Sequence, residues 1–431
     1  MISTKCIIPI LLSVLMANYT YSQTPTMSKA PALTEGTPES VGMSSSRIAR
    51  IDQMCQEAVE NSDVPGIVAL VARRGKIVYH KAFGQAKPSG ESLERDDIFR
   101  IASQSKAITS TAVMMLWEEG LFQLDDPVSK YIPEFANPQV LSSFRYSDTS
   151  YTTVPADKEI TIRHLLTHTS GIGYGIIDGD ERFKMIYGKA GITDLFTTEP
   201  VTIKQSVLKL AKLPLHHNPG EKFTYSEGLD VLGYFIEVMS GLSFDEFLRT
   251  RLFEPLGMHD TYFYLPREKS ARLVAVQKQE GGQWMQFPVT FYDTDYPIKG
   301  ARTFYSGGAG LSSTVKDYAT FLQMYLNGGA LNGVRILSRT TIEAILSGQV
   351  GDLLGIERNY GLAFGLTTPE GAAKGGNASA GTFDWGGYFN TQYFADPKEQ
   401  LIGIIFKQTQ GPVGDQTRWK FRILAEQAID D

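Results

Sequence analysis

The chain has 431 residues, and 41 Lys and Arg against 47 Asp and Glu give a formal net charge of −6. This length allows two packed domains or one large one, and the composition is that of a soluble globular protein. The lack of a basic excess argues against nucleic acid or an anionic membrane as a partner. No run of about 20 apolar residues predicts a membrane span.

The N-terminus has the pattern of a secretory signal peptide. Lys5 provides the positive charge, residues 6–17 the apolar stretch and residues 18–23 a polar exit. We therefore expect residues 1–22 to be a signal peptide and the protein to be periplasmic or secreted. Cleavage leaves Cys55 as the remaining cysteine, so we expect no internal disulfide.

The next segments predict a linker, a helix and a hairpin. Residues 23–38 are polar and rich in Thr, Pro and Ser, which is typical of a linker. Apolar residues at helical spacing between Ser44 and Ser62 predict an amphipathic helix. The β-branched runs Gly66–Ala72 and Lys76–His80 predict two hairpin strands. This order is not the alternation of a parallel sheet.

A serine and a lysine three residues apart, Ser103 and Lys106, begin an almost entirely apolar helix pattern that runs through Trp117. On a helix this spacing puts them on adjoining faces, about 4.5 Å apart along the axis. A buried lysine has its pKa lowered from roughly 10.4 and can activate a serine nucleophile. The helix N-terminus favours a developing oxyanion. The alternative is a capping serine beside a surface lysine.

The same Ser-x-x-Lys spacing recurs at two other places. Ser206 and Lys209 lie in an amphipathic helix pattern, so we expect Ser206 to face solvent. Ser313 and Lys316 follow a glycine-rich turn at what resembles a helix N-cap. Only Ser103 precedes a helix that is apolar all round, which is normally a buried helix.

Helical patterns dominate the middle of the chain, and strand patterns return near its end. We expect residues 106–300 to form a mostly helical domain inserted into a sheet domain made from residues 39–105 and 301–431. The C-terminal strands are predicted at Tyr360–Leu366, Thr382–Trp385, Thr391–Ala395 and Leu401–Phe406, and a final helix at Gln416–Ile429.

Other motifs argue against a metal or cofactor. His164 and His168 lie one helical turn apart, but no Glu follows the first as in His-Glu-x-x-His, so we expect packing roles and no metal. Gly307–Gly310 lacks a following Gly-Lys-Ser or Gly-Lys-Thr, so we expect no phosphate-binding loop there. The chain has no Gly-x-Ser-x-Gly, so the nucleophile elbow of the α/β-hydrolases is not expected. We expect no cofactor.

Three segments together resemble the serine β-lactamase and penicillin-binding-protein family, in particular its class C-like and esterase branches. They are Ser103–Lys106, Pro219–Glu227 and the Trp-Gly-Gly of residues 385–387. The resemblance spans most of residues 38–410. It implies an α/β (α+β) fold of the β-lactamase/transpeptidase type, with an antiparallel sheet flanked by helices, a mostly helical second domain and a cleft between them.

The resemblance also implies roles for individual residues. Ser103 would be the acylated nucleophile, Lys106 would accept its proton, and Tyr225 would be the partner general base or acid. The backbone N–H groups of Ser103 and Tyr388 would form the oxyanion hole. The substrate-binding residues would be Trp385, Gly386, Gly387 and Glu227.

Two departures from the family pattern indicate which of the family's activities to expect. Glu227 stands where the family typically has Asn, and Trp385 stands where β-lactamases have Lys. The cation that would hold a β-lactam carboxylate is missing, and the Trp-Gly-Gly form resembles the esterase and acyltransferase branch.

We therefore expect a secreted serine hydrolase that acts on a small-molecule ester or amide through an acyl-serine intermediate, with an ester preferred. A β-lactamase or D-amino-acid peptidase is the second candidate. A penicillin-binding-like module that binds peptide without turnover is the candidate from another class. The sequence predicts no oligomeric state.

Overall fold

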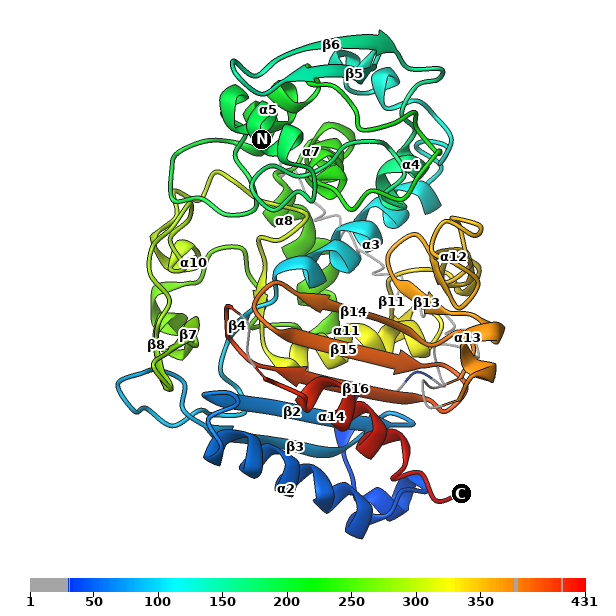
Figure 1. Ribbon diagram of the computed structural model, residues 1–431. Helices are drawn as coiled ribbons and strands as arrows, with labels where there is room; N and C mark the ends of the chain where they lie inside the picture. The colour runs from blue at the N-terminus through cyan, green and yellow to red at the C-terminus, as the bar shows by residue number, and fades with distance from the viewer. Residues whose placement is uncertain (1–29, 31, 376–378, 412–413) are drawn as a thin grey trace, which may run out of the picture.

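One eight-stranded sheet built from both ends of the chain forms the centre of the protein (Figure 1). The computed structural model describes residues 30, 32–375, 379–411 and 414–431, so the predicted signal peptide lies outside the described residues. The strand order is β1-β3-β2-β16-β15-β14-β13-β12, and every neighbouring pair is antiparallel except β1 and β3. The strands are β1 Thr34–Glu35, β2 Gly66–Arg73, β3 Lys76–Gly84, β12 Arg358–Tyr360, β13 Gly365–Thr367, β14 Phe383–Gly387, β15 Thr391–Asp396 and β16 Leu401–Phe406.

Helices cover both faces of this sheet. Every residue of β2 is buried, and alternate side chains of the strand enter two different cores. Ala69 and Val71 pack with α2 (Ser45–Glu60) and α14 (Thr417–Glu426), whereas Leu70 packs on the side of α3 (Ser105–Glu118) and α11 (Val315–Leu326). The predicted single sheet with helical cover is confirmed.

Helices are the commonest regular elements in the middle of the chain, which also carries two hairpins that the sequence analysis did not predict. Its helices are α4 Ile162–Leu166, α5 Glu181–Ala190, α6 Ile203–Leu210, α7 Gly228–Ser240, α8 Phe244–Leu248, a π-helical turn Arg249–Phe253, α9 Glu254–Leu256 and α10 Tyr296–Lys299. The hairpins are β5 Gln139–Arg145 with β6 Ser150–Pro155, and β7 Gln277–Glu280 with β8 Gln283–Gln286.

The remaining elements are short and connect these parts. They are the 3-10 turns Pro38–Val41, Val128–Lys130, Pro133–Phe135 and Arg267–Arg272, the strand pairs β4 Phe99–Arg100 with β9 Ser312–Ser313 and β10 Ala330–Leu331 with β11 Val334–Arg335, and the helices α12 Arg339–Ile345 and α13 Pro369–Ala373. Among the residues that the structure describes, no helix has both the length and the apolar character needed to cross a membrane.

Three local predictions differ from the structure. Ser206 does not face solvent: it is 5% exposed and donates a hydrogen bond to the Thr193 carbonyl at 3.2 Å. The run Tyr360–Leu366, predicted as one strand, belongs to two strands joined by a turn. The turn packs on α12, because the Leu362 N–H donates a hydrogen bond to the Ile345 carbonyl at 2.9 Å. The end of the predicted linker is also structured, since Thr34–Glu35 pairs with β3.

Candidate active site

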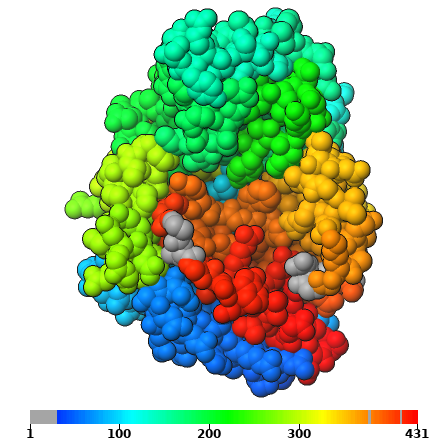
Figure 2. All heavy atoms as spheres, in the orientation of Figure 1, coloured from blue at the N-terminus to red at the C-terminus, as the bar shows by residue number. Residues whose placement is uncertain are grey.

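Ser103 lies where a buried strand turns into a buried helix. The chain leaves β4, makes a 3-10 turn over Ala102–Gln104 and continues directly into α3. Ala102 is fully buried and has a φ of +43°, a positive value that is uncommon for a non-glycine residue. The turn is held in place because the Ile101 N–H donates to the Leu311 carbonyl at 3.0 Å. Figure 2 shows a hollow between the helical part and the orange strands, with the cyan of the α3 region at its floor.

Lys106 is the polar centre of the site. Its side chain is 1% exposed, and its Nζ contacts three oxygens: the Ser103 hydroxyl at 3.3 Å, the Tyr174 hydroxyl at 2.8 Å and the Gly308 carbonyl at 2.7 Å. A buried amine is costly unless it is hydrogen-bonded, and these three partners satisfy it. The predicted approach of Lys106 to Ser103 is therefore present in the structure.

Asp230 fixes the carbonyl that holds Lys106. Its Oδ1 accepts hydrogen bonds from the Gly308 N–H at 2.7 Å and the Ser306 hydroxyl at 2.8 Å. Burial raises the pKa of Asp230 to about 6, against the lowering effect of these hydrogen bonds and of the nearby Lys106. The sequence analysis did not single out Asp230, although an aspartate inside the strongly apolar pattern of α7 is the kind of signal that could have found it.

Tyr225 shares this pocket. The Lys106 Nζ lies 4.6 Å from the centre of the Tyr225 ring, and the Trp385 Nε1–H donates to the Tyr225 hydroxyl at 3.2 Å. On its other side the ring packs against His168, with ring centres 4.6 Å apart. Side chains from α3, from the segment before α7 and from β14 thus converge beside Ser103, and all three motifs of the predicted site meet.

Tyr174 is a member of the site that the sequence analysis missed. Its hydroxyl is the closest side-chain partner of the Lys106 Nζ, and its ring lies 5.6 Å from that of Tyr225. Burial raises the pKa of Tyr174 well above its usual value, and the neighbouring Tyr225 and Asp230 add to the rise. Tyr174 is therefore a neutral phenol at ordinary pH. It sits in a glycine-rich loop and matches no motif, so no local pattern marks it.

The two histidines considered as metal ligands have packing roles. His168 Nδ1 interacts with the Ser226 hydroxyl at 3.2 Å, and His164 Nδ1 accepts the Thr161 N–H at 3.1 Å at the start of α4. Burial lowers the pKa of His164 to about 4 and that of His168 well below its usual value, so both rings are neutral. In the part of the chain that the structure describes, no three His, Cys, Asp or Glu side chains converge as metal ligands.

The third motif brings the turn after β14 close to the segment that leads into Ser103. A Cβ added at Gly387 would lie 2.4 Å from the Ile101 carbonyl oxygen, so glycine is needed for this close approach. A Cβ at Gly386 would meet nothing closer than 3.2 Å. Tyr388 follows directly, and the Ser103 N–H belongs to the first turn of its helix, where such groups have no intrahelical acceptor. The two N–H groups predicted for the oxyanion hole therefore lie on neighbouring segments.

Beside this turn the site has an aromatic wall. Tyr388 is 36% exposed, and its ring lies 6.4 Å from those of both Phe196 and Tyr292, which are buried. Glu227, predicted to bind substrate, is only 2% exposed, and burial together with the nearby Asp194 carboxyl raises its pKa well above its usual value. Its side chain is thus engaged inside the protein.

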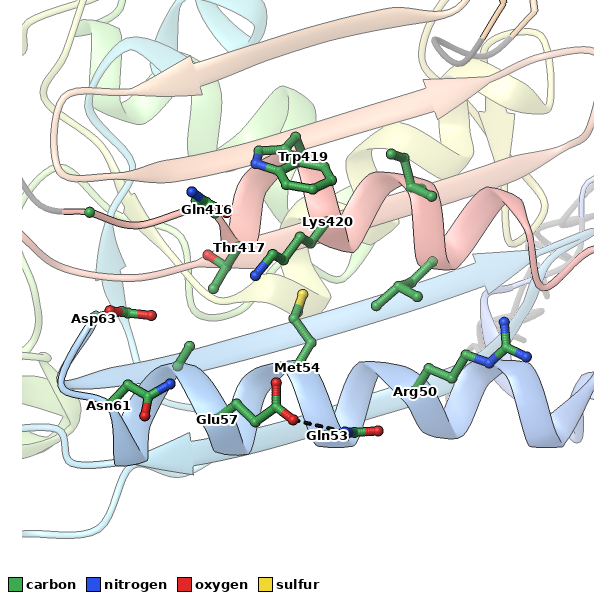
Figure 3. A pocket seen from close by; sticks show the side chains of 14 residues that line it. Arg50, Gln53, Met54, Glu57, Asn61, Asp63, Gln416, Thr417, Trp419 and Lys420 are labelled. Atoms are coloured by element: carbon green, nitrogen blue, oxygen red, sulfur yellow. Dashed lines mark hydrogen bonds between the residues drawn. The ribbon is translucent and has the colours of Figure 1, made fainter.

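Another hollow lies elsewhere, between α2 and α14 (Figure 3). Its volume is about 650 Å³, and mostly polar side chains such as Arg50, Glu57 and Lys420 line it, together with Trp419. None of the predicted site residues borders it. A hollow by itself therefore does not identify the active site, and the candidate active site is the one around the buried lysine.

Comparisons with known proteins agree with the geometry. The family model described as Beta-lactamase matches residues 51–427. The chain is 31% identical to Esterase EstB of Burkholderia gladioli, with 84% of this chain and 90% of that protein covered. It is 29% identical to the lovastatin esterase of Penicillium rubens, with 84% and 93% covered.

A solved structure shares the fold. EstCE1, described as a hydrolase with promiscuous acyltransferase activity, superposes with a TM-score of 0.73 at 23% identity over 90% of this chain and 99% of that chain. Together with the family match, this shows that the chain belongs to the Beta-lactamase family, as a carboxylesterase-like serine hydrolase.

Proposed function

We propose that this protein cleaves or transfers the acyl group of uncharged esters through a covalent acyl-Ser103 intermediate. The observation that carries the proposal is the buried Lys106 amine in contact with the Ser103 hydroxyl, with the Tyr225 phenol in the same pocket. The esterase names of the relatives support the same reaction class.

In the acylation step Lys106 acts as the base. As a free amine it has two N–H groups, which match the Gly308 carbonyl and the Tyr174 oxygen, and one lone pair, which is left for the Ser103 hydroxyl. The Ser103 oxygen attacks the ester carbonyl carbon while its proton passes to Lys106. The carbonyl oxygen becomes an oxyanion held by the N–H groups of Ser103 and Tyr388.

Tyr225 completes the proton transfer. Its hydroxyl gives a proton to the departing alkoxide, and its oxygen recovers one from the Lys106 ammonium. The Trp385 N–H holds that oxygen in place between the two events. Water, or a second alcohol in an acyl transfer, then attacks the acyl-serine by the same steps in reverse. This restores Ser103 and releases the acid or the new ester.

The first prediction concerns the nucleophile. A fluorophosphonate probe should label the native protein, and Ser103→Ala should abolish both labelling and ester hydrolysis, since the Ser103 hydroxyl is the serine oxygen in contact with Lys106. Lys106→Met and Tyr225→Phe should each lower kcat by about a hundredfold or more while the fold persists. Mass spectrometry of the labelled peptide and circular dichroism measure these outcomes.

Ser206→Ala and Ser313→Ala are the matched controls, because both serines occur in the same Ser-x-x-Lys spacing. Both should keep the label. An unlabelled native protein would instead favour the non-catalytic binding module, and labelling that survives in Ser103→Ala would assign the nucleophile to another residue.

The second prediction tests the oxyanion hole through its backbone. Gly387→Ala should push the turn away from Ile101 and carry the Tyr388 N–H with it, which lowers kcat by about 10²-fold. Gly386→Ala, one residue earlier on the same strand, should cost less, because its Cβ would meet its nearest atom at 3.2 Å rather than at 2.4 Å or less. The measurement is kcat of the two variants on one ester by steady-state kinetics. Equal losses would place the oxyanion donor elsewhere.

The third prediction concerns the substrate. Trp385 offers a neutral N–H where a β-lactamase would offer a lysine, so a β-lactam carboxylate finds no matching cation there. We expect kcat/KM for p-nitrophenyl butyrate to exceed that for a chromogenic cephalosporin by about a hundredfold or more, the cost of a lost charge-assisted contact. Faster turnover of the cephalosporin would make the protein a β-lactamase, and turnover of a D-alanyl peptide alone would make it a peptidase.

Export is also part of the proposal. The charged, apolar and polar regions of residues 1–23 support a signal peptide. When the full chain is expressed in a Gram-negative host, we expect the active protein in the periplasm or medium, with an intact mass that lacks about the first 22 residues. An unprocessed protein retained in the cytoplasm would contradict export without affecting the assignment of the reaction.

A further inference from the structure

Two carboxyl groups meet behind the loop that carries Tyr174, and neither belongs to the proposed catalytic steps. They are Asp194, in the segment after α5, and Glu227, at the start of α7, and we call them the acid pair. Both residues are anchored to the same loop, residues 173–176, and the interaction between the two carboxyl groups contributes a rise to the pKa of Glu227. Glu227 is 2% exposed, and the Glu227 Oε1 and Asp194 Oδ1 atoms are both out of contact with solvent.

Neither of these two buried oxygens has a hydrogen-bond donor. Two ionised carboxylates in contact would repel each other and would each leave a buried charge unpaired, which is costly. One proton placed between the groups removes one charge and gives both orphaned oxygens a partner. The Asp194 Oδ2 accepts the Ile176 N–H at 2.6 Å, which favours Asp194 as the anion and Glu227 as the protonated partner.

The acid pair closes a ring around the Tyr174 loop, residues 173–176. At one end the Glu227 N–H donates to the Gly173 carbonyl at 3.0 Å, and at the other end the Ile176 N–H donates to Asp194. The interaction between the two carboxyl groups joins these two anchors. Tyr174 lies between them, with its hydroxyl 2.8 Å from the Lys106 Nζ.

The loop itself leaves little room for adjustment. A Cβ at Gly173 would lie 2.3 Å from the Asp178 Oδ2, and a Cβ at Gly175 would lie 2.8 Å from the Asp194 Oδ2. The Asp178 Oδ2 also accepts the Tyr174 N–H at 2.8 Å. The position of Tyr174 is therefore determined by the groups that hold the loop.

We propose that Asp194 and Glu227 share one proton, and that this protonated acid pair is a clasp that positions Tyr174 against Lys106. The proposal goes beyond the proposed function and depends on it only where turnover is measured. Asp194 and Glu227 are positioning residues, since they act on Lys106 through Tyr174. Loss of the shared proton would set two anions against each other and open the ring.

The electrostatic surroundings of the pair agree with a bound proton. Burial raises the pKa of Glu227 well above its usual value, and the Asp194 carboxyl adds to the rise. Burial also raises the pKa of Asp194, against the hydrogen bonds that it accepts. The titratable groups that face the pair from the packed elements are Tyr174 and Asp178 of the loop, Tyr187 of α5, Asp230 of α7 and Tyr388 of the β14–β15 turn.

The sign of the pH dependence follows from these shifts. The folded protein holds the Glu227 proton at pH values where the unfolded chain, with a carboxyl pKa of about 4.3, has already lost it. Stability therefore falls as the pH rises from about 4.3 to the raised pKa of the folded state. Glu227→Gln replaces the protonated acid with an amide that donates the same hydrogen bond and cannot ionise, so it removes this part of the decline.

The test combines two readouts that need no turnover. The infrared spectrum of the native protein near pH 7 should show the C=O stretch of a protonated carboxylic acid, and Glu227→Gln should remove it. Tm measured from pH 5 to pH 9 should fall less steeply in Glu227→Gln than in the native protein. Glu237→Gln is the matched control on the same helix: Glu237 accepts the Phe244 N–H at 3.1 Å, far from Tyr174 along α7, and this variant should keep the infrared band.

Kinetics then test the positioning role. Glu227→Ala should lower kcat by about tenfold, Tyr174→Phe by a similar factor, and the double variant by little more than either, because both act on one contact. Glu227→Gln should recover most of the loss caused by Glu227→Ala. If Glu227→Ala does not fold, the Gln variant and the double variant Glu227→Gln/Tyr174→Phe still report the coupling.

Three results would overturn the proposal: no protonated-acid band in the native protein, parallel Tm curves, or losses from Glu227→Ala and Tyr174→Phe that multiply independently. The infrared and Tm measurements decide the shared proton even if the protein hydrolyses no ester. A failure of the proposed function is thus distinguishable from a failure of this inference.

Discussion

The site depends on keeping one lysine amine away from water and close to one serine. Lys106 is almost completely buried, and each of its contacts is made by a group that is itself held: Ser103 by the turn at Ala102, Gly308 by Asp230, and Tyr174 by its loop. An unpaired buried polar group costs about 1–3 kcal/mol, and an unpaired charge costs more. The surrounding hydrogen bonds therefore both offset this cost and aim the amine. A reactive lysine and a stable core are obtained from the same contacts.

The central sheet explains how distant parts of the chain reach this lysine. Its strands come from both ends of the sequence, so β14, near the C-terminus, lies beside the segment that leads into Ser103. The β4–β9 pair ties that segment to the chain just after Gly308. The part of the chain inserted between the two halves supplies Tyr174 from a loop, Tyr225 from the segment before α7, and Asp230 from α7. The hollow above α3 in Figure 2 is thus bordered by the helical part on one side and the sheet on the other.

Much of this arrangement was predictable from local patterns, and the remainder depended on long-range contacts. The apolar run after Lys106 and the β-branched runs near both ends determined the buried helix and the sheet, because burial of every face leaves a continuous apolar signal. The prediction that Ser206 faces solvent was wrong because its helix packs closely enough to cover the polar face at that point. Tyr174 and Asp194 could not be found, since they lie in loops where no periodicity or motif marks them. Local sequence also could not predict the role of Glu227, because its partner Asp194 is distant in sequence.

The balance of charge around Ser103 bears on which substrates suit the site. Trp385 holds Tyr225 with a neutral N–H, and the aromatic wall at Tyr388 adds no charge. Behind the catalytic groups lie Asp230 and the acid pair, which carry negative charge unless protonated. A substrate carboxylate brought into this setting would lose its hydration, meet anions at short range and gain no cation from the third motif. A neutral ester loses little hydration and places its developing oxyanion at the two N–H groups, where charge appears only in the transition state. Under the proposed function, the same arrangement around Ser103 favours uncharged acyl donors, and a tryptophan in place of a lysine is the difference from the β-lactamase pattern on a shared fold.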